Sequence, residues 1–127
     1  MQSKEPKIVI ALKAARLAAK EILKFSRRMD KVKIYEKGPT DFVTQVDRIA
    51  ENIIISSISE SFPDSAFICE ESGKSGKEKS DLVWVIDPID GTTNFIHGFP
   101  YYSISIACYE KDVLSHGIIY DITRDDE

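Results

Sequence analysis

The sequence predicts an α+β fold in which two long helices pack on a mostly antiparallel β-sheet. Two long stretches in the first half have apolar residues at helical spacing, and short apolar runs follow, the last two alternating as a hairpin does. With 127 residues, 43% of them hydrophobic, the chain has enough apolar side chains for a core. We therefore expect one layered domain, or part of a larger one.

The first helix is expected from Pro6 to about Arg28. Proline suits the first turn of a helix, where its missing N–H group is not needed. Apolar residues recur every three or four positions and so share one face, while basic side chains fall on the other. A packing role accounts for this helix, whose apolar face comprises Ile8, Leu12, Ala15, Ala19 and Ile22.

A second helix is expected over residues 40–61. Its residues divide into one apolar face, which would pack on the sheet, and one polar face. The expected apolar face comprises Phe42, Val46, Ile49, Ala50 and Ile53. The expected polar face comprises Arg48, Glu51, Asn52 and Ser59.

Three polar residues near the start of this helix need separate weighing. Asp41, Thr44 and Asp47 all suit the capping of free N–H groups, and capping is the interpretation favoured for Asp41. Asp47 lies further in and could instead accept a hydrogen bond from a hydroxyl such as that of Thr92, which would orient a water molecule. Both interpretations stay open for Asp47.

A short apolar strand is expected over residues 66–69, and two acids follow it directly. Glu70 and Glu71 could be a solvated strand end, which is usual for glutamate, or could supply a third metal ligand. Residues 72–77 are polar and rich in glycine, and we expect them to form a loop.

The central motif is the run from Trp84 to Pro100. A buried strand over residues 82–86 is expected to end at Asp87-Pro88, because proline cannot donate to a sheet. Asp87 and Asp90 would repel each other unless cations join them, and their hard oxygens suit Mg²⁺ or Mn²⁺. Alone, the same residues are also typical of a turn.

The residues after Asp90 supply the parts of a phosphate seat. Gly91 allows a close backbone approach, and Thr92 and Thr93 are expected to begin a short helix with free N–H groups. Metal ions beside an anion site are what phosphate ester chemistry needs. His97 is a candidate for substrate contact.

The last two apolar runs predict an antiparallel hairpin. Residues 101–109 alternate, Lys111-Asp112 makes a turn, and residues 113–122 form the second strand. His116 in that strand is interpreted as a packed or edge residue rather than a ligand.

Composition excludes several classes of function. The net charge of −4 argues against nucleic-acid binding through a basic surface, and the apolar runs are too short to cross a membrane. Cys69 and Cys108 lack metal-finger spacing and are interpreted as reduced, buried thiols. We expect a cytoplasmic protein with neither a nucleic-acid nor a membrane partner.

Three motifs together resemble the inositol monophosphatase family in order, spacing and content. They are Asp41-x-x-Thr44-x-x-Asp47, Cys69-Glu70-Glu71-Ser72, and the long signature from Trp84 to Pro100. The resemblance implies the N-terminal, metal-binding half of a layered αβαβα sugar-phosphatase fold over residues 1–127. The C-terminal domain, with its W-D-x-A-A-G motif, would be absent.

The resemblance implies a set of metal ligands. Glu70 would bind the first Mg²⁺, Asp87 would bridge the metals, the carbonyl of Ile89 would complete the first site, and Asp90 would hold the second metal. Mn²⁺ is a possible substitute.

The resemblance also implies roles in substrate binding and catalysis. The N–H groups of Gly91 and Thr92 would bind the phosphate, with Thr93 and Glu70 beside them. Asp47 and Thr92 would orient the attacking water on the metal that Glu70 holds.

The implied reaction is Mg²⁺-dependent, lithium-sensitive hydrolysis of a phosphate monoester, with inositol monophosphate as the first candidate. Fructose-bisphosphate, phosphoadenosine and histidinol phosphate are alternative substrates of relatives with similar metal motifs. A truncated, non-catalytic binding module is the alternative of another class. A homodimer is also expected.

Overall fold

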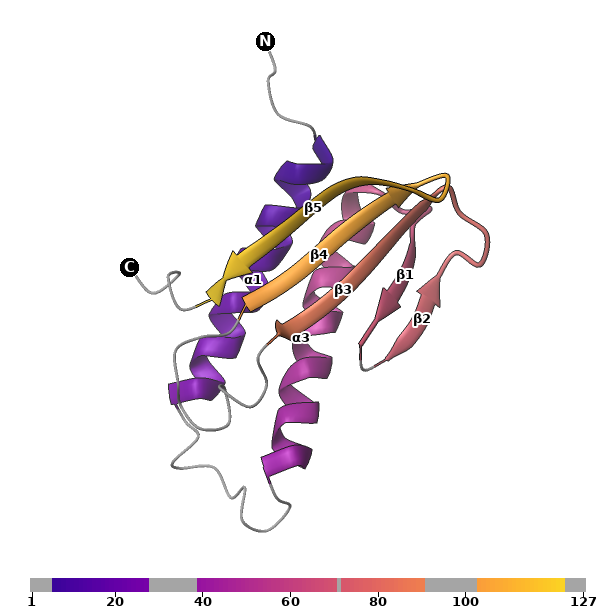
Figure 1. The fold of residues 1–127 in the computed structure, drawn as a ribbon. Helices are drawn as coiled ribbons and strands as arrows, with labels where there is room; N and C mark the ends of the chain where they lie inside the picture. The colour runs from indigo at the N-terminus through magenta and orange to yellow at the C-terminus, as the bar shows by residue number, and fades with distance from the viewer. Residues whose placement is uncertain (1–5, 28–38, 71, 91–102, 123–127) are drawn as a thin grey trace.

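Two helices lie on one face of a β-sheet in the computed structural model, which describes residues 6–27, 39–70, 72–90 and 103–122 (Figure 1). Helix α1 spans Pro6–Arg27, and helix α3 spans Pro39–Ser61 and runs in the opposite direction. The predicted α+β class is confirmed. The strands are β1 (Ala66–Cys69), β2 (Gly73–Gly76), β3 (Leu82–Asp90), β4 (Ser103–Glu110) and β5 (Val113–Asp121).

The sheet has the strand order β2-β1-β3-β4-β5. The β1–β3 pair is parallel, and the β1–β2, β3–β4 and β4–β5 pairs are antiparallel, so the prediction of a mostly antiparallel sheet is confirmed. Because β1 and β3 run side by side in the same direction, residues that follow them emerge at the same end of the sheet. The hairpin of β4 and β5 turns at Lys111 and Asp112, whose φ angles are 50° and 70°.

Helix α1 packs through small side chains. Ile8 and Leu12, expected on its apolar face, are only half-buried, so the face is turned slightly from the prediction. Alanines let the helix approach α3 and the sheet closely, because they carry no bulk beyond Cβ. The buried residues of this helix are Ala11, Ala14, Ala15, Ala18, Ala19 and Ile22.

Helix α3 buries a face that differs from the prediction. Ile49, expected in the core, is 38% exposed, and Glu51, expected on the polar face, is 0% exposed. The reason is geometric: each residue turns a helix by about 100°, so positions 47, 50, 51, 54 and 58 share one side. Glu51 therefore lies between the buried residues Ala50 and Ile54.

Part of the polar segment expected as a loop forms strand β2. Gly73–Gly76 pairs antiparallel with β1, with Gly73 opposite Cys69, which leaves a three-residue loop over residues 70–72. Gly73 has φ +75°, a conformation that suits glycine and closes such a loop. The prediction was wrong because the β2–β1 ladder pairs backbone groups and needs no apolar side chains.

The core lies between the helices and the inner face of the sheet. Trp84 is 1% exposed, and its indole N–H donates to Ser65 Oγ at 3.0 Å. On the other face of the sheet, Ile68 is 40% and Ile119 79% exposed. Within the described residues, neither helix combines the length and apolarity needed to cross a membrane.

Candidate functional site

The parallel pairing of β1 and β3 brings Glu70 next to Asp87. Cys69 pairs with Ile86, and the N–H of Glu70 donates to the carbonyl of Ile86 at 3.2 Å. Glu70 directly follows Cys69, and Asp87 directly follows Ile86. Neighbouring strands lie about 4.8 Å apart. The structure therefore places these two predicted metal ligands at the same end of adjacent strands.

A β-bulge brings position 90 to the same face as Asp87. Asp87 pairs with Ser105 and Asp90 with Ser103, so three steps along β3 match two along β4. Without the extra residue, positions three apart on a strand would lie on opposite faces. The strand was predicted to end at Asp87-Pro88, but it continues to Asp90, because a bulge tolerates a proline that cannot donate to the ladder.

Helix α3 contributes two buried acids at this end. Glu51 accepts two hydrogen bonds through Oε1, from the N–H of Ser72 at 3.0 Å and from the hydroxyl of Ser72 at 2.7 Å. Asp47 is 6% exposed and lies one turn earlier, about 6 Å along the axis. Since β1 runs back along α3 after the turn at residues 62–65, this earlier turn lies toward the carboxyl end of β1.

The described acids match the chemistry of a Mg²⁺ or Mn²⁺ site. Carboxylate oxygens are hard ligands, and acids at one sheet end repel each other until a cation joins them. Among the described side chains, no three His, Cys, Asp or Glu residues are grouped closely enough to hold a metal ion. Of the predicted ligands, the structure brings together Glu70 and Asp87, and places position 90 on the face of Asp87 by register alone.

Several predicted site residues lie outside the described part of the chain. They include the side chain of Asp90 and all of residues 91–102, so the roles expected of Gly91, Thr92, Thr93 and His97 stay predictions. The side chains of Asp41 and Thr44 also lie outside it, as does Glu71. Ile89 is 3% exposed, and its expected role as a carbonyl ligand stays a prediction.

The cysteine beside this site is a buried thiol. Burial, and next the Glu51 carboxyl, raise the pKa of Cys69 to about 11, although a hydrogen bond with Ser72 opposes the shift. At neutral pH the sulfur keeps its proton, and a protonated thiol is neither a nucleophile nor a metal ligand. Cys69 and Cys108 are both free and buried, as the sequence predicted.

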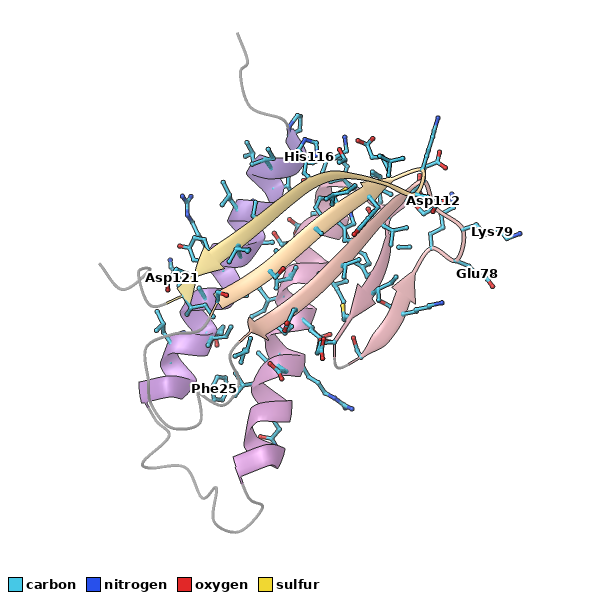
Figure 2. The ribbon with its side chains drawn as sticks, viewed as in Figure 1. Phe25, Glu78, Lys79, Asp112, His116 and Asp121 are labelled. Carbon is cyan, nitrogen blue, oxygen red and sulfur yellow. The ribbon has the colours of Figure 1, made fainter. Side chains whose placement is uncertain are left out.

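Two other polar regions lie apart from the acids. At the opposite end of the sheet, near Asp112 (Figure 2), the Ser115 hydroxyl donates to Glu110 at 2.8 Å and lies 2.7 Å from Nδ1 of His116. The hydrogen bond from the Ser115 hydroxyl is the main cause of the lowered pKa of Glu110. His116 is a partly buried residue of the edge strand β5, as predicted.

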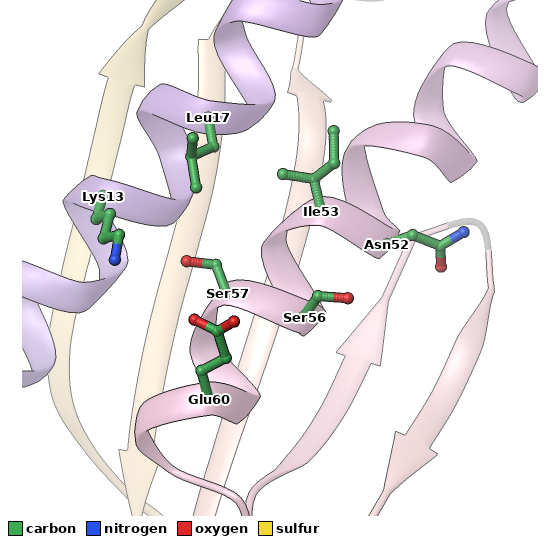
Figure 3. A pocket seen from close by; sticks show the side chains of 7 residues that line it. All are labelled: Lys13, Leu17, Asn52, Ile53, Ser56, Ser57 and Glu60. Atoms are coloured by element: carbon green, nitrogen blue, oxygen red, sulfur yellow. The ribbon is translucent and has the colours of Figure 1, made fainter.

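The second region is a groove between α1 and α3, on the side of the helices that faces away from the sheet (Figure 3). Its volume is about 420 Å³, and Lys13 and Leu17 of α1 face Ser57 and Glu60 of α3 across it. None of the predicted catalytic, metal or substrate residues that the structure describes lines it. We therefore locate the candidate site at the carboxyl ends of β1 and β3.

Comparison with known proteins agrees with this geometry. A family model described as the inositol monophosphatase family matches residues 3–126. The chain belongs to the inositol monophosphatase family. Its described acids at the ends of β1 and β3 come from two of the motifs that predicted this membership.

Relatives of this family member include proteins named SuhB and one named SaIMPase-II. The Nus factor SuhB of Pseudomonas aeruginosa is 43% identical over 125 residues, which cover 97% of this chain and 46% of that protein. The native crystal structure of the extragenic suppressor protein suhB of Bartonella henselae has a TM-score of 0.82 at 34% identity, covering 95% and 47% of the two chains. Inositol monophosphate-bound SaIMPase-II has a TM-score of 0.74 at 28% identity, covering 95% and 42%. The chain thus spans slightly less than half the length of these relatives.

The sequence-based interpretation missed Glu51 as a residue of the site region. A signal was present, because Glu51 follows Asp47 by four positions and such pairs share a helix face. Glu51 was expected on the polar face because it is charged, and fully buried glutamates are rare.

Proposed function

We propose that this chain carries the metal-binding half of an enzyme that hydrolyses a phosphate monoester with Mg²⁺, with inositol monophosphate as the first candidate substrate. The single observation that carries the proposal is the strand register that brings Glu70, Asp87 and position 90 to one end of the sheet. Membership of the inositol monophosphatase family supports the phosphatase chemistry. Glu70, Asp87 and Asp90 would hold the metal ions, with the Ile89 carbonyl.

The bound cations would lower the pKa of a coordinated water and neutralise charge on the phosphoryl oxygens. The chain's own residues would orient the reactants. Asp47, which is 6% exposed, and the hydroxyl of Thr92 would hold and orient the attacking water. The N–H groups of Gly91 and Thr92 would bind the phosphate.

Inositol monophosphate is favoured because the crystal structure of one relative, SaIMPase-II, has it bound. Fructose-bisphosphate and phosphoadenosine remain the alternatives. We propose that the residues that distinguish these substrates belong largely to the half of the relatives that this chain does not match.

Mg²⁺-dependent release of phosphate from inositol monophosphate tests the proposal. We expect activity in the wild type, and a rate at least about 100-fold lower in Asp90→Asn, because a lost ligand removes most of the metal's contribution. Asp112→Asn, at the opposite end of the sheet, is the matched control and should keep the wild-type rate. A wild-type rate in Asp90→Asn would contradict the proposed metal site.

A binding function is the second candidate, because a 43% identical relative is named a Nus factor. On that view the chain would act by binding a protein partner and would need no hydrolysis. Inactivity of the wild type and Asp90→Asn alike, together with normal folding, would favour either this candidate or a catalytic half whose activity needs the part of the relatives that this chain does not match.

A further inference from the structure

The loop that carries Glu70 is held at both of its ends. It consists of residues 70–72, between β1 and β2. At its start, the N–H of Glu70 donates to Ile86, the residue directly before Asp87. At its end, the N–H and hydroxyl of Ser72 both donate to Glu51 on α3. The helix and the neighbouring strand therefore fix the loop together.

Glu51 is an acidic residue in a fully buried position. It is 0% exposed and flanked on its helix by the buried Ala50 and Ile54. Burying a carboxyl group is unfavourable unless hydrogen bonds replace its hydration, and an apolar side chain of similar volume is often equally stable in such a place. Both bonds to Ser72 reach the same atom, Oε1, at 3.0 and 2.7 Å. These two hydrogen bonds tie the carboxyl to the loop, which an apolar side chain at this position could not do.

We propose that Glu51 is a positioning residue that sets the place of the Glu70 carboxylate relative to Asp87. It does so through Ser72, two residues after Glu70, and is not itself assigned as a ligand. This inference rests on the proposed metal site. Groups that orient ligands raise metal affinity because the ligand is already held in place, so less conformational entropy is lost when the metal binds.

The test is Mn²⁺ binding to the full chain, followed by electron paramagnetic resonance. We expect Glu51→Ala to weaken binding about 10- to 100-fold. Glu51→Gln should stay within about threefold of the wild type, because the amide keeps an oxygen in the place of Oε1 that accepts both bonds. Ser72→Ala should fall between them, since it loses the hydroxyl bond and keeps the N–H bond.

Ile54→Ala is the matched control for lost stability. Ile54 is also fully buried on α3, so its truncation should lower the melting temperature and leave Mn²⁺ affinity unchanged. Hydrogen exchange gives a second readout that needs no metal. The Ser72 amide should exchange faster in Glu51→Ala than in Ile54→Ala when both are compared at equal global stability.

Two results would overturn the proposal in distinguishable ways. If Glu70→Gln and Asp87→Asn abolish binding while Glu51→Ala binds Mn²⁺ like the wild type, Glu51 has only a structural role. If Glu70→Gln and Asp87→Asn bind like the wild type, the metal site itself is misplaced, and the positioning role falls with it.

Discussion

The two helices have the same place in the fold but bury different kinds of residue. Both lie on one face of the sheet, and each presents a stripe of buried side chains (Figure 1). Among the described side chains, the stripe of α1 consists of alanine and isoleucine, whereas α3 also buries Asp47, Glu51 and Ser57. Buried carboxyl groups are unfavourable for folding, so their presence on α3, and not among the described side chains of α1, favours a functional role for α3. We therefore expect α1 to act in packing alone, and α3 to pack and also to serve the proposed site.

The largest expected effect separates function from stability on α3. Asp47→Asn should lower the proposed hydrolysis about 10²- to 10⁴-fold, because the group that orients the water is lost. Its melting temperature should not fall, since a buried carboxyl is replaced by a neutral group of the same shape. Steady-state phosphate release and thermal unfolding measure the two effects. Glu60→Gln, exposed on the same helix, is the control and should change neither.

The opposite result is expected on α1. Ala15 is 0% exposed, and Ala15→Leu should reduce the free energy of unfolding by about 1–3 kcal/mol through overpacking. Mg²⁺ affinity should stay unchanged under conditions in which the variant is folded. Urea unfolding and metal titration check this pair of outcomes, with Leu17→Ala, 42% exposed, as the control. A large loss of metal affinity in folded Ala15→Leu would show that α1 also serves the site.

The two buried thiols, Cys69 and Cys108, make the folding stability depend on pH, and a different helix acts on each of them. Each has a pKa raised from 9.0 to about 11, chiefly by burial, but Glu51 of α3 adds to the shift of Cys69 whereas Lys7 of α1 opposes that of Cys108. The folded state therefore binds the thiol proton more tightly, so stability should fall as pH rises from 9 towards 11, by about 2 kcal/mol or less per thiol.

Urea unfolding at pH 8 and pH 10.5 measures this loss, and Cys69→Ala and Cys108→Ala should each reduce it. An unchanged pH dependence in both variants would show that other groups cause the loss.

The smallest effect concerns the outer side of α3. The Ser57 hydroxyl is buried and has no hydrogen-bond partner among the described residues, and it faces the groove between the helices (Figure 3). Ser57→Ala should raise the free energy of unfolding by about 0.5–1 kcal/mol, because an unsatisfied polar atom is removed. Ser56→Ala, exposed on the same groove, should stay within about 0.5 kcal/mol of the wild type. A clear loss of stability in Ser57→Ala would mean that the hydroxyl is satisfied by water in the groove.

The sequence predicted best where periodicity was strong. The span of α1, strand β1 and the β4–β5 hairpin were confirmed because apolar spacing dictates each of them. Strand β2 was missed because its residues pair through backbone groups and carry no apolar signal. The membership of Glu70 and Asp87 in one site came from motifs, whereas their placement side by side needed the parallel register.

Two features of the candidate site depend on tertiary structure and could not be predicted. The bulge between Asp87 and Asp90 depends on pairing with β4, a strand that comes later in the chain. The contact between Glu51 and Ser72 joins residues 21 positions apart, beyond the range of any local pattern. Their consequence is that Glu70 comes next to Asp87, and Glu51 reaches Ser72, only after the fold has formed.

Titration calorimetry with Mg²⁺ on this chain tests the central claim most directly. We expect one moderately tight site and a poor second one. Glu70→Gln and Asp87→Asn should each abolish the tighter site, and Asp112→Asn should leave it intact. Binding that is unchanged in both Glu70→Gln and Asp87→Asn would contradict the account.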